Sequence, residues 1–226
     1  MVKVERSYPE PASLAVERKK ETGSYEKEDV VERLKEDFHD KCYICERKGL
    51  PDPQVEHLLP HKNGKIKERK FDWDNLFWVC PHCNGVKNQQ KYEEKILDCC
   101  RTDPEQRITF RYAGDNVIIE PKQQIDEMAR MTAELVWEVF NIKNTGMRVI
   151  KSDYRMRELT KEMNLLYRNL REYKEKPNSG TARRKLRALL KRDSAFAAFK
   201  RCYIRDHKNE YPQWDSYLTK QTEETP

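Results

Sequence analysis

Residues 41–88 decide the fold and read KCYICERKGLPDPQVEHLLPHKNGKIKERKFDWDNLFWVCPHCNGVKN. Two Cys-x-x-Cys pairs stand at the ends of this stretch: Cys42 with Cys45, and Cys80 with Cys83. Paired thiolates are the usual ligand set of a closed structural zinc site, and ordinary core cysteines do not pair twice in this way. We therefore predict that the four cysteines hold Zn²⁺ and that losing any one unfolds the stretch. His82, inside the second pair, is the alternative to one thiolate.

Four polar residues between and just after the cysteines indicate chemistry rather than structure alone: Glu56, His57, Asn75 and Asn84. An imidazole titrates near neutrality, so His57 can take a proton from water at working pH. Glu56 can hold a hard divalent cation such as Mg²⁺ or Mn²⁺, which would neutralise charge on a scissile phosphate. We expect Asn75 to orient His57 or the metal, and Asn84 to complete the metal site from a helix N-terminus. The alternative for His57 is a buried structural histidine.

Lysines around these residues are candidates for contact with a phosphate backbone. Three lie in the loop after Pro60 and two on the helix expected after the second cysteine pair: Lys62, Lys65, Lys67, Lys87 and Lys91. Each contact of a lysine with a phosphate makes binding more sensitive to salt. The alternative is a solvated loop without a ligand.

The composition limits the class of protein. The 226 residues carry a net charge of +6, but residues 1–142 hold 24 basic and 28 acidic residues, whereas residues 143–226 hold 21 and 11. A basic C-terminal half is typical of contact with nucleic acid and equally of solvated helices. Seven cysteines, four of them in metal-type pairs, favour a reducing cytoplasm over a secreted, disulfide-bonded protein. No apolar run approaches the length of a membrane span, so we expect no membrane partner.

The hydrophobic pattern predicts an α+β fold in four regions. An extended arm (1–24) precedes a zinc-containing domain (25–100) with a helix over 25–40 capped by Ser24 or Asp29, strands over 54–58 and 76–79, and a helix over 84–97. A β-hairpin connector (101–122) follows. The last region (123–226) is helical and basic, with helices over 125–140, 147–174, 181–191 and 194–205, the last capped by Asp193 or Ser194, and a polar tail over 207–226.

The central stretch resembles the HNH endonuclease superfamily. That pattern combines an acid–His pair, a Pro three residues on, a middle Asn, and a terminal His or Asn after a zinc cysteine. Here these are Glu56-His57, Pro60, Asn75 and Asn84. The resemblance implies a ββα-metal core stapled by zinc, with His57 as general base, Glu56 and Asn84 as metal ligands, and Asn75 orienting the site. The chain departs from the commoner pattern at two of these positions, with Glu56 in place of Asp and Asn84 in place of the terminal His.

Roughly the first 100 residues also resemble the HNH subunit of Septu-type antiphage systems, some of which accompany retrons. The residues that carry this likeness are the arm with Tyr8-Pro9-Glu10-Pro11, the stretch 41–46, and Asp74-Asn75-Leu76. The resemblance implies an ABC-type ATPase partner, and in some systems a retron reverse transcriptase with its RNA–DNA product.

Two rivals to a DNA endonuclease remain at this point. The same site can serve an RNA endonuclease, for example one that cuts tRNA. A zinc-ribbon adaptor, binding nucleic acid or protein without catalysis, would also carry the four cysteines. An adaptor has no need of the set formed by Glu56, His57, Asn75 and Asn84, so this set favours the enzyme.

Overall fold

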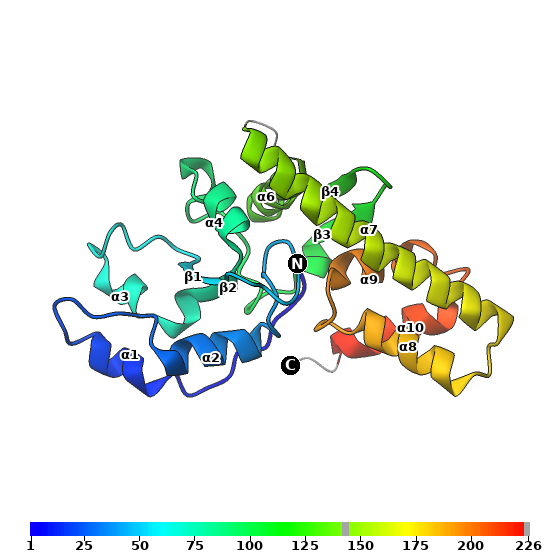
Figure 1. Cartoon of the computed structure of the whole chain (residues 1–226), viewed down its shortest axis with the longest axis horizontal. Coiled ribbons are helices and arrows are strands. Elements are labelled where there is room, and N and C mark those ends of the chain that lie inside the picture. Colours follow the sequence, from blue (N-terminus) through cyan, green and yellow to red (C-terminus); the bar gives the residue numbers. More distant parts are fainter. Residues whose placement is uncertain (142–144, 224–226) are drawn as a thin grey trace.

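The computed structural model describes residues 1–141 and 145–223 (Figure 1). Its cysteine-rich part is built on two short antiparallel strands, β1 (Gln54–His57) and β2 (Leu76–Val79). The register pairs Glu56 with Phe77 and His57 with Leu76, so both candidate catalytic residues lie at the end of β1. All four residues of β2 are buried. The two strands lie where the sequence pattern predicts them.

A helix on either side encloses this pair of strands. Helix α2 (Glu28–Asp37) packs against β2 and buries Val30 and Leu34, four residues apart. The predicted cap, Ser24 or Asp29, is wrong. Lys27 is the N-cap residue of α2, and its side chain makes no capping hydrogen bond. The Asp29 carboxylate instead accepts bonds from the backbone N–H and hydroxyl of Ser13.

Helix α4 (Pro81–Lys87) packs against β1 and is shorter than predicted. It begins at the second cysteine pair, and a 3₁₀ turn, η2 (Gln90–Tyr92), follows where a helix to residue 97 was expected. Tyr92 and Ile96 turn into the core from this irregular segment. The chain leaves the helix here and buries these two side chains from an irregular segment instead.

The N-terminal arm docks on the rest of the chain and is not fully extended. It contains a short helix, α1 (Ala12–Glu17), which packs on α2. The backbone N–H of Val4 donates to the carbonyl of Cys99 at 2.9 Å. The guanidinium of Arg6 lies 4.9 Å from the ring centre of Trp73 and close to two further aromatic rings. The arm is therefore part of the core.

Between β1 and β2 the chain forms a polar loop with α3 (Lys67–Lys70) and a 3₁₀ turn, η1 (Trp73–Asn75). After a short helix, α5 (Pro104–Arg107), the predicted hairpin is present as β3 (Ile108–Tyr112) and β4 (Val117–Pro121). Helix α6 (Glu127–Asn141) lies against β4 and also contacts α4. It thereby links the hairpin to the candidate site.

The C-terminal part is helical, as predicted, with α7 (Gly146–Glu175), α8 (Gly180–Leu190), α9 (Ala197–Asp206) and α10 (Pro212–Glu223). Figure 1 shows α7 running from beside α6 to the far end of this helical part. The spacing of Leu159, Met163, Leu166 and Leu170 places all four in the core. The predicted polar tail is wrong, because α10 buries Trp214 and Leu218. Among the described helices none is long and apolar enough to cross a membrane.

The first cysteine loop joins the two parts of the molecule. The carboxylate of Glu46, 1% exposed, accepts from the N–H of Ala198 at 2.9 Å, and the carbonyl of Glu46 accepts from Phe196 at 3.1 Å. Glu46 thus caps the N-terminus of α9 from 152 positions away in the chain. Neither Asp193 nor Ser194 caps α9, which has Phe196 in a left-handed conformation at its N-cap.

Candidate active site

The four cysteines of the two pairs converge on one point: Cys42, Cys45, Cys80 and Cys83 are all buried, and their sulfur atoms lie within 4.8 Å of one another. In a tetrahedral site with Zn–S bonds of about 2.3 Å, neighbouring sulfurs are roughly 3.8 Å apart. The donor set therefore fits a structural zinc ion. Among the described residues this is the one cluster of His, Cys, Asp and Glu side chains close enough to hold a metal.

Two helices of the helical part, α7 and α6, contact the cysteine cluster and its surroundings. The guanidinium of Arg155 in α7 donates to the sulfur of Cys80 at 2.9 Å, and its positive charge compensates thiolate charge. His82 lies outside the ligand set, because its Nε2 bonds to the carbonyl of Val139 in α6 at 3.0 Å. Burial lowers the pKa of His82 to about 4, so this imidazole is a neutral structural link between α4 and α6.

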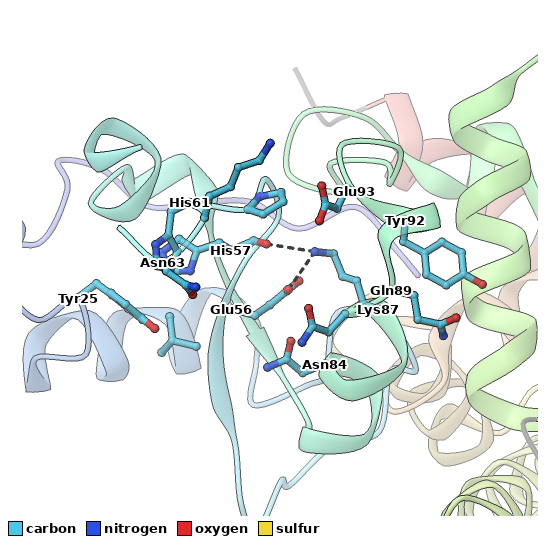
Figure 2. Close-up of a pocket in the computed structure, with 14 residues that line it drawn as sticks. Tyr25, Glu56, His57, His61, Asn63, Asn84, Lys87, Gln89, Tyr92 and Glu93 are labelled. Carbon is cyan, nitrogen blue, oxygen red and sulfur yellow. Dashed lines mark hydrogen bonds and ion pairs between the residues drawn. The ribbon is translucent and has the colours of Figure 1, made fainter. Parts of the chain in front are cut away.

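Beside the cysteine cluster a pocket of about 370 Å³ opens between β1, α4 and the loop that follows β1. Glu56, His57, His61, Lys87 and Asn84 line it, together with Tyr25 and the segment around η2 (Figure 2). The structure therefore brings three of the four predicted catalytic residues to one cavity.

Glu56 lies at the bottom of this pocket and is 6% exposed. The hydroxyl of Tyr43 donates to one of its carboxylate oxygens, and the ammonium of Lys87 donates to the other at 3.0 Å. Lys87 also donates to the carbonyls of His57 and Leu58, both at 3.1 Å. One cation thus holds the end of β1 and the Glu56 carboxylate together (Figure 2).

The surroundings of His57 keep its imidazole neutral. Burial lowers its pKa to about 4, and the charges of His61, Lys87 and Lys70 act in the same direction. Its Nε2 lies 3.1 Å from the carbonyl of Lys70. Because a carbonyl can only accept, Nε2 carries the proton and Nδ1 keeps its lone pair. No described residue donates to that Nδ1, so it is free to accept a proton.

Asn75 is 3% exposed and does not face the pocket. Its amide oxygen accepts from the N–H of Leu59 at 2.7 Å, and its amide nitrogen donates to the carbonyls of Leu59 and Arg69, both at 2.9 Å. These bonds close the loop between β1 and β2 onto itself. Arg69 is followed by Lys70, whose carbonyl bonds to His57, so Asn75 is connected to His57 only indirectly, through the backbone.

The remaining predicted residues take different positions. Asn84 lines the pocket from within α4, rather than from its first residue, and its amide nitrogen donates to Gln54 at 3.0 Å. Lys62 lines the pocket and is exposed, as are Lys65 and Lys67. Lys91 pairs with Glu134 and Glu138 of α6. Lys87 is paired with the buried carboxylate of Glu56. Of the five lysines that we predicted to contact nucleic acid, Lys62, Lys65 and Lys67 are therefore the three that are exposed and have no carboxylate partner among the described residues.

His61 is a pocket residue that the sequence analysis missed. Its ring centre lies 4.4 Å from that of His57, and it lines the same cavity. The available signal was a second imidazole four residues after His57 and directly after Pro60, at the start of the lysine-rich loop.

Comparison with known families identifies the class of site. Residues 42–90 match the family described as HNH endonuclease. A search among curated proteins returned no match. The chain therefore contains an HNH endonuclease domain at residues 42–90, with a cysteine cluster able to bind zinc, a mixed α/β architecture with small sheets, and a helical C-terminal region. The predicted fold class is confirmed.

Proposed function

We propose that this protein is a metal-dependent endonuclease that hydrolyses phosphodiester bonds, with DNA as the favoured substrate. The observation that carries the proposal is the state of His57: a buried, neutral imidazole whose Nε2–H is held by the carbonyl of Lys70, with Nδ1 left to accept a proton. It lies in a polar pocket next to a buried carboxylate, within the HNH domain.

In the proposed hydrolysis, different residues of the pocket have different roles. His57 Nδ1 takes a proton from a water molecule, whose oxygen attacks the phosphorus. The P–O bond to the leaving nucleotide breaks, and the leaving oxygen takes a proton from solvent. Lys62 is placed to hold a neighbouring phosphate at the rim of the pocket.

Oxygen donors in the pocket fit a hard divalent cation. Glu56 offers carboxylate oxygens and Asn84 an amide oxygen, the ligand types that Mg²⁺ and Mn²⁺ prefer. Each carboxylate oxygen can accept a second interaction beside the one from Tyr43 or Lys87, so a cation can share Glu56 with Lys87 or displace it. A bound Mg²⁺ supplies charge neutralisation at the scissile phosphate.

The test is a cleavage assay on plasmid DNA and on structured RNA with Mg²⁺, Mn²⁺ or EDTA. It compares the wild-type protein with His57→Ala and with a matched control, His207→Ala, whose imidazole lies outside the pocket and bonds to the carbonyl of Tyr203. We expect metal-dependent cutting that only His57→Ala abolishes. Cutting of RNA alone would make RNA the substrate in place of DNA. No cutting by zinc-loaded, folded wild-type protein, either alone or with the proteins that co-purify with it, would refute the nuclease.

A zinc-ribbon adaptor is the second candidate. The observation that favours it is that both oxygens of Glu56 already have a partner within the protein, Tyr43 and Lys87, as the oxygens of a purely structural carboxylate would. For an adaptor, nucleic-acid binding without cutting is expected, and His57→Ala should leave that binding unchanged.

We propose further that the chain is the nuclease subunit of an antiphage complex with an ABC-type ATPase, in some systems together with a retron reverse transcriptase and its RNA–DNA product. Support comes from the Septu-type resemblance of the first 100 residues and from an exposed apolar stripe on α7. Met147, Ile150 and Tyr154 follow a helical spacing and are 63%, 60% and 40% exposed. Ile150 and Tyr154 line a groove of about 300 Å³ together with Leu50 and Pro51.

This assembly is tested by purifying the tagged chain from its native host and identifying bound proteins by mass spectrometry. We expect a stoichiometric ABC-type ATPase with the wild-type chain and its loss with Tyr154→Glu, which puts a charge on the apolar stripe. A chain that purifies alone and cuts nucleic acid at full rate would contradict the assembly.

A further inference from the structure

The pocket holds two imidazoles in contact, and the hydrolysis proposed above uses only that of His57. His57 and His61 lie with ring centres 4.4 Å apart and planes inclined by 59°. The ring of Tyr25 packs edge-on against both, at 4.5 Å from His57 and 6.1 Å from His61. Both histidines line the same cavity (Figure 2), so a substrate that reaches one also meets the other.

Backbone groups fix the two rings in complementary roles. In His57 the carbonyl of Lys70 takes the Nε2–H, which leaves Nδ1 as an acceptor. In His61 the N–H of Gly64 donates to Nδ1 at 2.8 Å. Because Nδ1 of His61 accepts, the proton of the neutral ring stands on Nε2. One ring therefore offers the pocket a lone pair, and the other offers an N–H.

The loop that fixes His61 is conformationally costly. Lys62, Asn63 and Gly64 have φ of 49°, 55° and 82°, three successive left-handed residues. For a residue with a side chain this conformation costs roughly 1–2 kcal/mol. The tight turn brings the N–H of Gly64 back onto His61, and strained backbone of this kind concentrates at functional sites.

We propose that the Nε2–H of His61 donates a hydrogen bond to a non-bridging oxygen of the scissile phosphate and stabilises the negative charge that develops there during hydrolysis. This role rests on the proposed nuclease function. It makes His61 a catalytic residue in addition to the acid, base and asparagines of the HNH pattern. Donors aimed at an oxygen that gains charge in the transition state are among the largest contributions to catalysis.

The surroundings of His61 favour a hydrogen-bond donor over a proton donor. Burial lowers its pKa, and the charge of Lys70 does so too. The ring is therefore neutral at working pH, and a neutral imidazole holds its N–H proton too tightly to transfer it to a leaving group. The proton balance of hydrolysis is unchanged: His57 takes the proton of the attacking water, and His61 keeps its own.

The experiment compares His61→Ala and His61→Gln with wild type in the same cleavage assay, with His207→Ala as the histidine control. The amide of Gln reaches nearly as far as Nε2 of histidine and restores an N–H donor. We expect kcat to fall about 100- to 1,000-fold in His61→Ala with little change in KM, and His61→Gln to recover at least a tenth of the lost rate. Zinc content and the urea unfolding midpoint should match those of wild type.

A measurement independent of activity tests the same role. Nitrogen chemical shifts of the histidine rings in ¹⁵N-labelled protein report which nitrogen carries the proton, and we expect Nε2–H for both His57 and His61. A proton on Nδ1 of His61, or wild-type kcat in a folded His61→Ala, would overturn the role of His61 alone. No cutting by the wild-type protein would instead remove the nuclease function, and this role with it.

Discussion

Asn75 provides the sharpest test of how the site is held together. Its amide makes three hydrogen bonds to the backbone of one loop, two to Leu59 and one to Arg69. A buried neutral hydrogen bond contributes about 1 kcal/mol net, so Asn75→Ala should lower the free energy of unfolding by about 3 kcal/mol. Asn75→Asp keeps the acceptor for the N–H of Leu59 but turns a carboxylate oxygen towards two carbonyl oxygens. At pH 7 it should be at least as destabilising as Ala, although it is nearly isosteric.

The assay is urea unfolding followed by tryptophan fluorescence in excess zinc, with Asn141→Ala as the control. Asn141 donates a single bond within the last turn of α6, so its removal should change the free energy of unfolding by less than about 0.5 kcal/mol. Under conditions where Asn75→Ala stays folded, loss of the loop geometry that presents the Lys70 carbonyl to His57 should slow cleavage on the order of 100-fold. A change of less than 0.5 kcal/mol in Asn75→Ala, or an Asn75→Asp protein more stable than Asn75→Ala at pH 7, would refute this reasoning.

Three further perturbations test other contacts. Cys45→Ser should lose zinc, with an apparent cost on the order of 10 kcal/mol, and unfold by near-UV circular dichroism, whereas Cys202→Ser should keep full zinc content by metal analysis. Lys87→Met leaves the buried carboxylate of Glu56 without its cation and should lower the free energy of unfolding by about 3–5 kcal/mol in urea. Mg²⁺ should stabilise this variant more than it stabilises wild type. An equal effect of Mg²⁺ on both proteins would argue against cation binding at Glu56. Burial raises the pKa of the Glu105 carboxyl, but its two arginine partners, Arg201 and Arg205, outweigh burial and lower this pKa overall. The stability that Glu105 contributes is therefore present above its pKa in the unfolded chain, near 4.3, and is lost as pH falls through its lower pKa in the folded protein. Glu105→Gln should be less stable than wild type at pH 7, yet lose less stability than wild type in thermal melts between pH 4.3 and 3.

Local signals in the sequence were sufficient for much of the fold. These signals are patterns among residues that are neighbours in the chain: the Cys-x-x-Cys pairs, the short apolar runs and the turn at Ala113-Gly114-Asp115. They were enough to predict the cysteine cluster, both strand pairs and the long helix α7. The missed helix α10 also had a local signal, because Tyr211, Trp214 and Leu218 repeat at helical spacing. Its polar residues masked that signal.

Long-range contacts account for what the sequence did not predict. The cap of α9 comes from Glu46, so no inspection of the residues before α9 could find it. The partners of Asn75 are backbone groups of a loop, which carry no sequence signal. Lys87 was expected to meet phosphate, but the buried carboxylate of Glu56 offers a closer partner in a less polar surrounding. The state of His57 likewise depends on the carbonyl of Lys70, thirteen positions away.

The helical part supports the HNH domain through contacts at and around the cysteine cluster. Arg155 of α7 contacts the sulfur of Cys80, the carbonyl of Val139 in α6 holds His82, and Glu46 beside the first cysteine pair receives the N-terminus of α9. Removing these helices would expose a thiolate charge, an imidazole and a buried carboxylate at once, each of which costs free energy when left without its partner. The same contacts tie α7, which carries the exposed apolar stripe, to the cysteine cluster. Arg155 of α7 bonds to Cys80, which directly precedes α4, the helix that carries both Asn84 and Lys87 into the pocket.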